Sequence, residues 1–557
     1  MKTITTLKAN CRDCHRCMRS CPLKAVGIGD GQARLIEEKC VLCGRCVIEC
    51  PQKAKQVESR VDEVAAVIKT GRPVVLSLAP SFVAAFPDFS PEQLFARLTG
   101  LGFVKVEETA VGAAVVSHHY SRMLNAGGRP VISACCPVVV SVIERYFPSL
   151  TDNLAPVVSP MIAHAKLLRQ RYGDDIFVVF AGPCIAKLAE SQAEGSPVDA
   201  ALTFAQLREW MANAHDAPVL AGIPAPGAVR YYPIPGGILK SFVDSELTAT
   251  DIIAVDGLEA CLEVFTALQK GEIAPRFIEA LACAGGCING PAIGSSRSTP
   301  AKRLKVAGFA TAGEQSDTDI PASIDFTRRH AATPVHEEIP PEFRIREVLN
   351  KTGKYTKQDE KNCGACGFST CRDKAIAVCQ GLTEIDTCVP YMRTKAESLA
   401  NFIVEHSLNA IIVVNSNMIV QEFNPVAEQM LNRRKEIIKG SRLGDVLDCT
   451  EIAAAVQAGR KVPGRRVEFA GGVASQMIIP VPAHDLVIIV MTDMTDQEKS
   501  ARELERMKFQ TVTKATEIID KQMQVAQEIA GLLGETTAET KAALLELVGL
   551  LKAKDGK

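Results

Sequence analysis

The stretch that decides the fold is CRDCHRCMRSCPLKAVGIGDGQARLIEEKCVLCGRCVIECP, residues 11–51, in which the pattern C-x2-C-x2-C-x3-C-P occurs twice. The two patterns contain, in order, Cys11, Cys14, Cys17 and Cys21, then Cys40, Cys43, Cys46 and Cys50. Three thiolates on a tight loop suit three corners of a 4Fe–4S cubane, and the distant cysteine of the other half supplies the fourth. We therefore expect Cys50 to complete the first cluster and Cys21 the second. Zinc is the alternative, but a zinc ion takes four ligands, and eight in a doubled register do not suit it.

The composition of the 557-residue chain agrees with a packed protein of several domains. Typical domain sizes predict about four domains, and 47% hydrophobic residues exclude a disordered chain. A net charge of −1, with no basic stripe, gives no reason to expect nucleic acid or an anionic membrane as partner. No apolar run approaches the ~20 residues that span a bilayer, and the first residues, MKTITTLKAN, lack the apolar region of an export signal. The predicted location is the cytoplasm, where twenty cysteines indicate metal-bound thiolates rather than disulfides.

The order of strand-like and helix-like patterns along the sequence predicts a multidomain α/β protein. Short β-rich runs alternate with helical patterns from about residue 59 to 345, the signature of an α/β domain. The expected strands are PVVLSLAP (73–80), FVKVEE (103–108), PVISA (130–134), DIFVVFAGP (175–183) and AALTF (200–204). Residues 90–102, SPEQLFARLTGLG, predict a helix with a Ser N-cap and a Pro at N1. The polar stretch 311–340 reads as irregular wrapping or a linker. Residues 410–424 predict a strand hairpin. The last part is helical, with a Gly-Glu-Thr-Thr break near residue 534. The predicted domains are 1–58 (two clusters), 59–345 (α/β), 346–395 (a second cysteine-rich unit), 396–496 (α+β) and 497–557 (helices).

The α/β region contains a further set of separated cysteines. Four of them, Cys136, Cys184, Cys283 and Cys287, supply enough thiolates for one more cubane. The glycines around Cys283 and Cys287 let the backbone approach a large cofactor. Cys135 precedes a candidate ligand and is left over, so it is a candidate proton-carrying thiol.

The second cysteine-rich unit has the spacing C-x2-C-x4-C-x16-C, formed by Cys363, Cys366, Cys371 and Cys388. This spacing resembles the small 4Fe–4S domain of corrinoid iron–sulfur proteins and of electron-transfer subunits. Zinc is the alternative, because a single set of four cysteines discriminates metals less well than a paired one. Cys379 falls on a helical pattern, and we interpret it as a core residue.

Three motifs of the central region resemble the signatures of [FeFe]-hydrogenases. Residues 133–137 (SACCP), 183–190 (PCIAKLAE) and 279–290 (EALACAGGCING) match TSCCP, MPCxxK and ExMxCxxGCxxG in order and approximate spacing. They follow a module that resembles bacterial two-cluster ferredoxins, so the resemblance covers about residues 1–300. It implies an H-cluster, which is a cubane bridged by a cysteine to a di-iron unit that carries CO, CN⁻ and a dithiolate amine.

The resemblance also implies roles for individual residues. Cys287 would bridge to the di-iron unit, and the other three thiolates would hold the remaining corners of the cubane. Lys187 would donate a hydrogen bond to a cyanide, and Cys135 would pass protons to the amine. The segment Ala79-Pro80-Ser81 would line the di-iron pocket. A structural cluster without a di-iron unit is the alternative.

The chain departs from the family at positions that govern turnover. Gly182 and Leu281 stand where other members have methionines, and a rough alignment puts His119 and Arg122 at the positions of two relay glutamates. Arginine stays protonated and cannot relay protons, so we expect slow or strongly biased hydrogen turnover. His118 or His119 is a candidate substitute, although two adjacent histidines on a helix are more often structural.

Residues 396–496 resemble a PAS domain of unknown ligand, from a lead-in helix, the hairpin, the Asn424-Pro425 step and a last strand that ends at Met494-Thr495-Asp496. The predicted cofactors are thus four 4Fe–4S clusters and one di-iron unit. The leading hypothesis is a sensory [FeFe]-hydrogenase with H2, protons, a ferredoxin-like redox partner, maturation proteins and a downstream kinase or phosphatase as partners. The helices from 497 suit a homodimer or partner docking, with a plain surface helix as the alternative. The competing functions are a catalytic hydrogen:ferredoxin oxidoreductase and a non-enzymatic electron-transfer protein.

Overall fold

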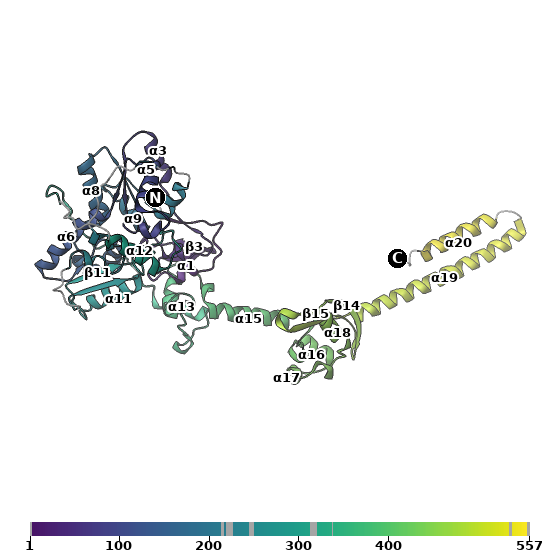
Figure 1. Ribbon diagram of the computed structural model, residues 1–557. Coiled ribbons are helices and arrows are strands. Elements are labelled where there is room, and N and C mark those ends of the chain that lie inside the picture. Colours follow the sequence, from purple (N-terminus) through teal and green to yellow (C-terminus); the bar gives the residue numbers. More distant parts are fainter. Residues whose placement is uncertain are drawn as a thin grey trace. The chain divides into compact units, whose positions relative to one another are not determined.

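The computed structural model describes residues 3–212, 215, 217–218, 227–243, 250–311, 320–336, 338–533 and 537–553. It contains two compact units, residues 1–392 and 393–557, and each is described by itself (Figure 1). The helix α15 (Val389–Glu405) passes from one unit to the other. Residues 312–319 and 337 of the expected linker and residues 534–536 of the expected Gly-Glu-Thr-Thr break lie outside the described residues.

The first 58 residues form a module of two similar halves. Its outer strands β1 (Ile4–Thr6) and β4 (Lys55–Val57) pair antiparallel, and β2 (Val26–Gly29) pairs with β3 (Gln32–Leu35). A short helix follows the first cysteines of each half, α1 (Arg16–Arg19) in one and α2 (Arg45–Ile48) in the other. The repeated cysteine pattern therefore corresponds to a repeated loop–helix unit.

The α/β region contains, within the described residues, two parallel sheets. One has the strand order β6-β5-β8-β9 and the other β10-β11-β7. The strands are β5 (Val74–Leu78), β6 (Lys105–Glu108), β7 (Val131–Ile132), β8 (Phe177–Gly182), β9 (Ala200–Thr203), β10 (Ile252–Asp256) and β11 (Phe277–Leu281). β5, β8 and β9 are buried along their whole length, as expected for parallel strands covered on both faces. The expected β-rich runs up to residue 204 are strands, whereas β10 and β11 were not expected.

Helices surround both sheets (Figure 1). They are α3 (Val61–Lys69), α4 (Phe82–Ala85), α5 (Pro91–Gly100), α6 (Ala110–Ala126), α7 (Pro137–Tyr146), α8 (Pro160–Tyr172), α9 (Ala186–Ser191), α10 (Phe204–Met211), α11 (Leu258–Gln269) and α12 (Thr299–Thr311), with the 3₁₀ turns η1 (Pro148–Asn153), η2 (Gly227–Tyr231), η3 (Leu239–Ser241) and η4 (Cys287–Asn289). Ser90 caps α5 in a capping box with Gln93, ahead of a proline at N1. α6 and α8 pack closely because Gly112 has no side chain, where a Cβ atom would lie 2.3 Å from the Pro160 carbonyl oxygen.

The second cysteine-rich region packs against the N-terminal module, although the whole α/β region separates them in the chain. It comprises α13 (Glu342–Lys351), η5 (Lys357–Asp359), α14 (Cys371–Cys379) and η6 (Ile385–Thr387). Phe368 lies in one apolar cluster with Cys17 and Met18. The Ile28 amide donates a hydrogen bond to the Leu382 carbonyl at 2.9 Å. The two cysteine-rich regions therefore share a packed interface.

The second unit is built on an antiparallel sheet with the strand order β13-β12-β16-β15-β14 in the described residues. Its elements are β12 (Ala410–Asn415), β13 (Val420–Phe423), α16 (Pro425–Leu431), α17 (Lys435–Ile438), η7 (Leu443–Asp445), α18 (Thr450–Ala458), β14 (Val462–Phe469), β15 (Gly472–Val481), η8 (Pro482–His484), β16 (Leu486–Asp493), α19 (Thr495–Leu533) and α20 (Thr537–Ala553). The side chain of Asn424 caps α16 by accepting a hydrogen bond from the Ala427 amide. Across the described part of the chain, no helix combines the length and apolarity needed to cross a membrane.

Candidate metal centre

The carboxyl ends of strands from both parallel sheets meet at one cavity. Ala79, Pro80 and Ser81 follow β5, Thr109 follows β6, Pro183 and Cys184 follow β8, Cys135 and Cys136 follow β7, and Cys283 follows β11. Ligands of open parallel sheets bind outside these strand ends. All the residues predicted for the H-cluster site line this one cavity, namely Ala79, Pro80, Ser81, Cys135, Cys136, Cys184, Lys187, Cys283 and Cys287.

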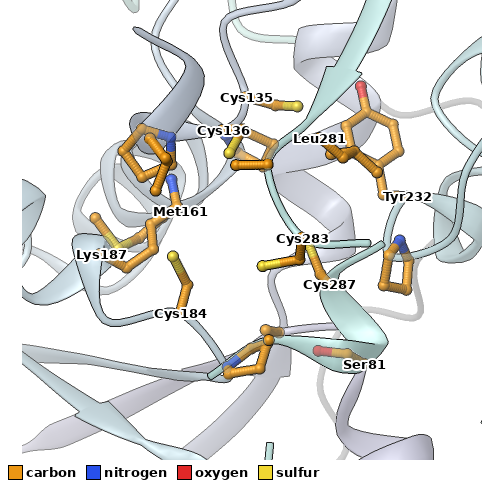
Figure 2. A pocket seen from close by; sticks show the side chains of 18 of the residues that line it. Ser81, Cys135, Cys136, Met161, Cys184, Lys187, Tyr232, Leu281, Cys283 and Cys287 are labelled. Atoms are coloured by element: carbon orange, nitrogen blue, oxygen red, sulfur yellow. The ribbon is translucent and has the colours of Figure 1, made fainter. Parts of the chain in front are cut away.

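Four thiols face one another across the cavity region. Figure 2 shows the sulfur atoms of Cys136, Cys184 and Cys283 directed toward a shared space, with Cys287 beside Cys283. Burial raises the pKa of Cys184 to about 12 and raises the pKa values of Cys283 and Cys287 as well, with further increases from the neighbouring cysteines. Metal ligation needs thiolates, so loading this site releases protons and stabilises the anionic form that burial alone disfavours.

The residues that line the central cavity fit an iron–sulfur cluster bound to a unit that carries polar ligands. The cavity measures about 110 Å³, whereas one water needs roughly 10–15 Å³. The Ser81 hydroxyl at its wall is buried and has no hydrogen-bond partner among the described residues, which suits a polar ligand in the cavity. Among the described residues, no three His, Cys, Asp or Glu side chains converge as ligands of a single metal ion. The thiolates of a cubane each bind a different iron, so a cubane does not require such convergence.

Lys187 lines the cavity from the first turn of α9. Its ammonium donates to the Glu190 carboxylate, 2.5 Å from Nζ to Oε2, and Arg328 lies 3.5 Å from the other oxygen of Glu190. An ammonium carries three N–H donors, so one bond to Glu190 leaves donors that a ligand in the cavity can use. Glu190 therefore orients Lys187 beside the thiols, a contact that the motif did not indicate.

Cys135 is buried beside Cys136 and Cys287. Burial raises its pKa well above the usual value, and the neighbouring thiols and Glu279 raise it further, so the thiol keeps its proton at neutral pH. Glu279 accepts backbone hydrogen bonds from Gly236 at 2.8 Å and Leu239 at 3.0 Å. That motif glutamate therefore anchors the loop before Leu239.

The histidines proposed as a substitute relay lie on α6 away from the cavity wall. His118 is exposed, and the half-buried His119 packs near the Phe326 ring. Neither they nor Arg122 is among the cavity-lining residues. Burial lowers the pKa of His119, and the charges of His118 and Arg122 lower it further. The structure therefore does not bring these residues to the site.

The absent methionine at position 182 has a steric explanation. A Cβ atom on Gly182 would lie 2.7 Å from the Phe180 ring and 3.3 Å from the Ala79 side chain, and Phe180 itself lines the cavity. Leu281 lines the cavity as an apolar side chain. Sequence reasoning missed Met161, Tyr232 and other wall residues, because no motif marks them and tertiary packing brings them in (Figure 2).

The N-terminal module brings its cysteines together in two groups. Cys50 lies with Cys11, Cys14 and Cys17 around one small cavity. The charge of Cys21 acts on Cys40, Cys43 and Cys46, whose pKa values are raised chiefly by burial. Cys43 also lines the central cavity, so the second group is adjacent to it.

Two buried lysines accompany the cysteines of the region 363–388. The Nζ atom of Lys354 lies 3.7 Å from Cys388 Sγ, within hydrogen-bond range for sulfur. Burial lowers the pKa of Lys374 to about 8, although Cys366 and Cys388 act to raise it. Cys371 begins α14, and Cys363 is exposed. Cys379, interpreted as core, is only half-buried at the end of α14.

Comparison with known families assigns three parts of the chain. Residues 72–291 match the family described as "Iron only hydrogenase large subunit, C-terminal domain", residues 10–55 match "4Fe-4S dicluster domain", and residues 359–390 match "Putative Fe-S cluster". The chain therefore contains an iron-only hydrogenase large-subunit domain joined to iron–sulfur modules. It is a [FeFe]-hydrogenase-like iron–sulfur protein, which confirms the resemblance drawn from the motifs.

One curated relative is iron hydrogenase 1 of Clostridium pasteurianum, 26% identical over 371 residues. The match covers 52% of this chain and 64% of the relative, so the chain spans less than two thirds of its length. Among solved structures, a variant of a [FeFe]-hydrogenase from Chlamydomonas reinhardtii is 19% identical, with a TM-score of 0.35 over 45% of this chain and 88% of that one. A domain of a sensory box sensor histidine kinase/response regulator from Geobacter sulfurreducens is 13% identical, with a TM-score of 0.16 over 18% of this chain and 96% of that one.

Proposed function

We propose that the chain binds and activates H2 at an H-cluster held in the central cavity. Cys136, Cys184, Cys283 and Cys287 would hold its cubane, and Cys287 would also hold the di-iron unit. When bound, this group supplies the site where H2 is split or formed. The observation that carries the proposal is the gathering of four thiols, Cys135, Lys187 and the unpartnered Ser81 hydroxyl on one cavity. Cys135 and Lys187 are not needed to hold a cubane.

We propose three further 4Fe–4S clusters as an electron relay. Two belong to the N-terminal module and one to the cysteines of residues 363–388. The second N-terminal group adjoins the central cavity through Cys43. One apolar cluster contains Phe368, Cys17 of the first group and Cys46 of the second, and it borders Cys366. These contacts support a relay that passes from the central site through the N-terminal groups to the C-terminal group.

We propose a hydrogen- or redox-sensing role with low turnover. The cavity wall lacks carboxylates from α6, and the relay positions carry His119 and Arg122. The residues 396–496 supply an antiparallel sheet with a small apolar core, as expected for a PAS domain. The output would pass through α19 and α20 to a second copy of the chain or to a signalling protein such as a kinase or phosphatase. We place the protein in the cytoplasm, with maturation proteins as assembly partners.

One observation favours a catalytic role instead. Cys14 is exposed, so the first cluster would lie close to the surface, where a soluble ferredoxin-like protein could exchange electrons with it. A hydrogenase of the hydrogen:ferredoxin type needs such access, whereas a sensor does not require fast exchange.

The matured full-length protein should be tested for isotope exchange between H2 and D2O and for steady-state hydrogen evolution. We expect HD formation together with evolution far slower than that of dedicated hydrogenases. Absence of HD would contradict hydrogen activation at this site. Fast evolution would contradict the sensory role and favour the catalytic one. The Cys287→Ser variant is the matched control, because it removes the bridging thiolate and should abolish HD formation.

A further inference from the structure

A chain of buried polar side chains leads away from the central cavity on the side of the four-stranded sheet. It begins at Thr109, which lines the cavity immediately after β6. The hydroxyl groups of Thr109 and Ser77 share a hydrogen bond of 2.7 Å, and both residues are buried. Ser77 and Glu107 are register partners on the neighbouring parallel strands β5 and β6. The strand pairing and this hydrogen bond therefore bring Thr109, Ser77 and Glu107 next to one another, with Thr109 at the cavity.

His164 extends this chain from the facing helix α8. Its Nδ1 atom lies 2.8 Å from the Ser77 hydroxyl, and the residue is fully buried. Its Nε2 atom has no hydrogen-bond partner and lies 3.6 Å from Glu107 Oε2. The close approach of α6 and α8 at Gly112 packs this helix against α6. A small movement of the imidazole or of the Glu107 carboxylate brings Nε2 and Oε2 within hydrogen-bond distance.

Glu107 connects the buried chain to the protein surface. Its carboxylate accepts hydrogen bonds from Arg171 at 2.9 Å and from the Tyr172 hydroxyl. Arg171 and Tyr172 lie seven and eight residues after His164, two turns further along the same face of α8. Both side chains are partly exposed, whereas Glu107 is buried.

The protonation states suit proton transfer. Burial lowers the pKa of His164, although Glu107 acts to raise it, so the imidazole is neutral with one donor and one acceptor nitrogen. Burial acts to raise the pKa of Glu107, but the nearby His164 imidazole, the hydrogen bond from Tyr172 and the charge of Arg171 outweigh it, and the net shift is downward. The ionised Glu107 carboxylate is therefore a proton acceptor. It lies next to His164, and the hydroxyls of Ser77 and Thr109 and the imidazole of His164 can each accept and donate a proton.

We propose that Thr109, Ser77, His164 and Glu107 carry protons between the central cavity and the surface. The inference rests on the proposed function and adds the route that the residues on α6 do not provide. Outward, Thr109 takes a proton from the cavity and gives its own to Ser77, and Ser77 gives its own to His164 Nδ1. His164 Nε2 then gives its proton to Glu107, which passes one to the Tyr172 hydroxyl as that partly exposed hydroxyl gives its own proton to water. Each group gains one proton and loses one, so only one proton moves in net terms.

The test uses the matured full chain with Ser77→Ala, His164→Gln and Glu107→Gln variants. Infrared spectra should follow how fast the CO and CN⁻ bands shift after H2 is admitted. Removing a proton-transferring group should slow that shift by roughly 100-fold, the low end of general acid–base effects. The control is Ser159→Ala, which removes a buried hydroxyl just before α8 that is not part of the proposed proton path. This variant should change the rate of the band shift less than about twofold.

A second readout does not depend on the loaded site. In unmatured protein labelled with ¹⁵N-histidine, Glu107→Gln should lower the pKa of His164 further, because the carboxylate acts to raise it. Bands that shift equally fast in the wild type and all three variants overturn the proton path but leave hydrogen binding intact. An unchanged His164 titration in Glu107→Gln also overturns it. Wild-type protein without CO and CN⁻ bands overturns the proposed function and the path together.

Discussion

Replacing Arg230 with methionine should destabilise the first unit strongly, because it leaves a buried charge without its partner. Arg230 donates two hydrogen bonds to Glu108, at 2.9 Å from Nε and 2.5 Å from Nη2. The two side chains are only 10% and 7% exposed. Glu108 directly precedes Thr109 at the cavity, and Arg230 lies in η2, just before Tyr232. The substitution also removes the guanidinium from the Phe309 ring, whose centroid lies 4.1 Å away, while an unbranched apolar side chain remains.

The expected loss is about 3–5 kcal/mol in the free energy of unfolding, the cost of breaking a buried ion pair on one side. The double variant Glu108→Gln with Arg230→Met should recover part of this, because an unpaired buried amide costs roughly 1–3 kcal/mol. Burial already raises the pKa of Glu108, and Arg230 acts to lower it. In Arg230→Met that pKa rises further above its unfolded value. The destabilisation is therefore full above the folded-state pKa and diminishes as the pH falls toward the unfolded-state value.

The assay is denaturant unfolding of the full chain followed by tryptophan fluorescence. Trp210 is the only tryptophan in the sequence, and it packs against Phe103 in the first unit, with ring centroids 5.6 Å apart. Its fluorescence therefore reports on that unit and not on residues 393–557. An Arg230→Met variant within about 1 kcal/mol of wild type would refute the reasoning. So would a double variant as unstable as the single one.

Three further predictions concern the clusters and the second unit. Cys50→Ser should remove the electron paramagnetic resonance signal of the first N-terminal cluster and Cys21→Ser that of the second; the reverse assignment would disprove the crossed ligation. Lys374→Met should lower the midpoint potential of the C-terminal cluster, on the order of 100 mV from one lost nearby charge, and an unchanged potential in a redox titration would contradict this. Asn424→Ala should cost about 2–4 kcal/mol, because the buried amide makes hydrogen bonds to Ile411, Ala427 and two carbonyls; hydrogen exchange across 410–493 should rise accordingly.

Local patterns in the sequence predicted much of the fold. The two Cys-Pro patterns predicted a module of two similar halves. Ser90 and Pro91 predicted the start of α5. Continuous apolar runs marked β5 and β8, which are buried on both faces. β11 was missed because its five residues, FIEAL, overlap the cysteine motif and are too short to separate from it.

The candidate site could be predicted only where a motif names its residues. The separated cysteines carry spacing that identifies them, and the structure brings them to one cavity. His164 and Glu107 carry no such pattern, because their contact depends on strand register and on how α8 packs. The contact between Ile28 and Leu382 joins segments far apart in the chain and has no local signal. Long-range packing of this kind is set by the whole fold.

The most direct test of the central claim is an infrared spectrum of the anaerobically matured full-length protein, recorded before and after admission of H2. An H-cluster held by Cys136, Cys184, Cys283 and Cys287 predicts CO and CN⁻ stretching bands that shift when H2 is admitted. A spectrum without such bands, from protein whose iron content accounts for every 4Fe–4S cluster, would show that the cavity holds a cubane alone and would contradict the account.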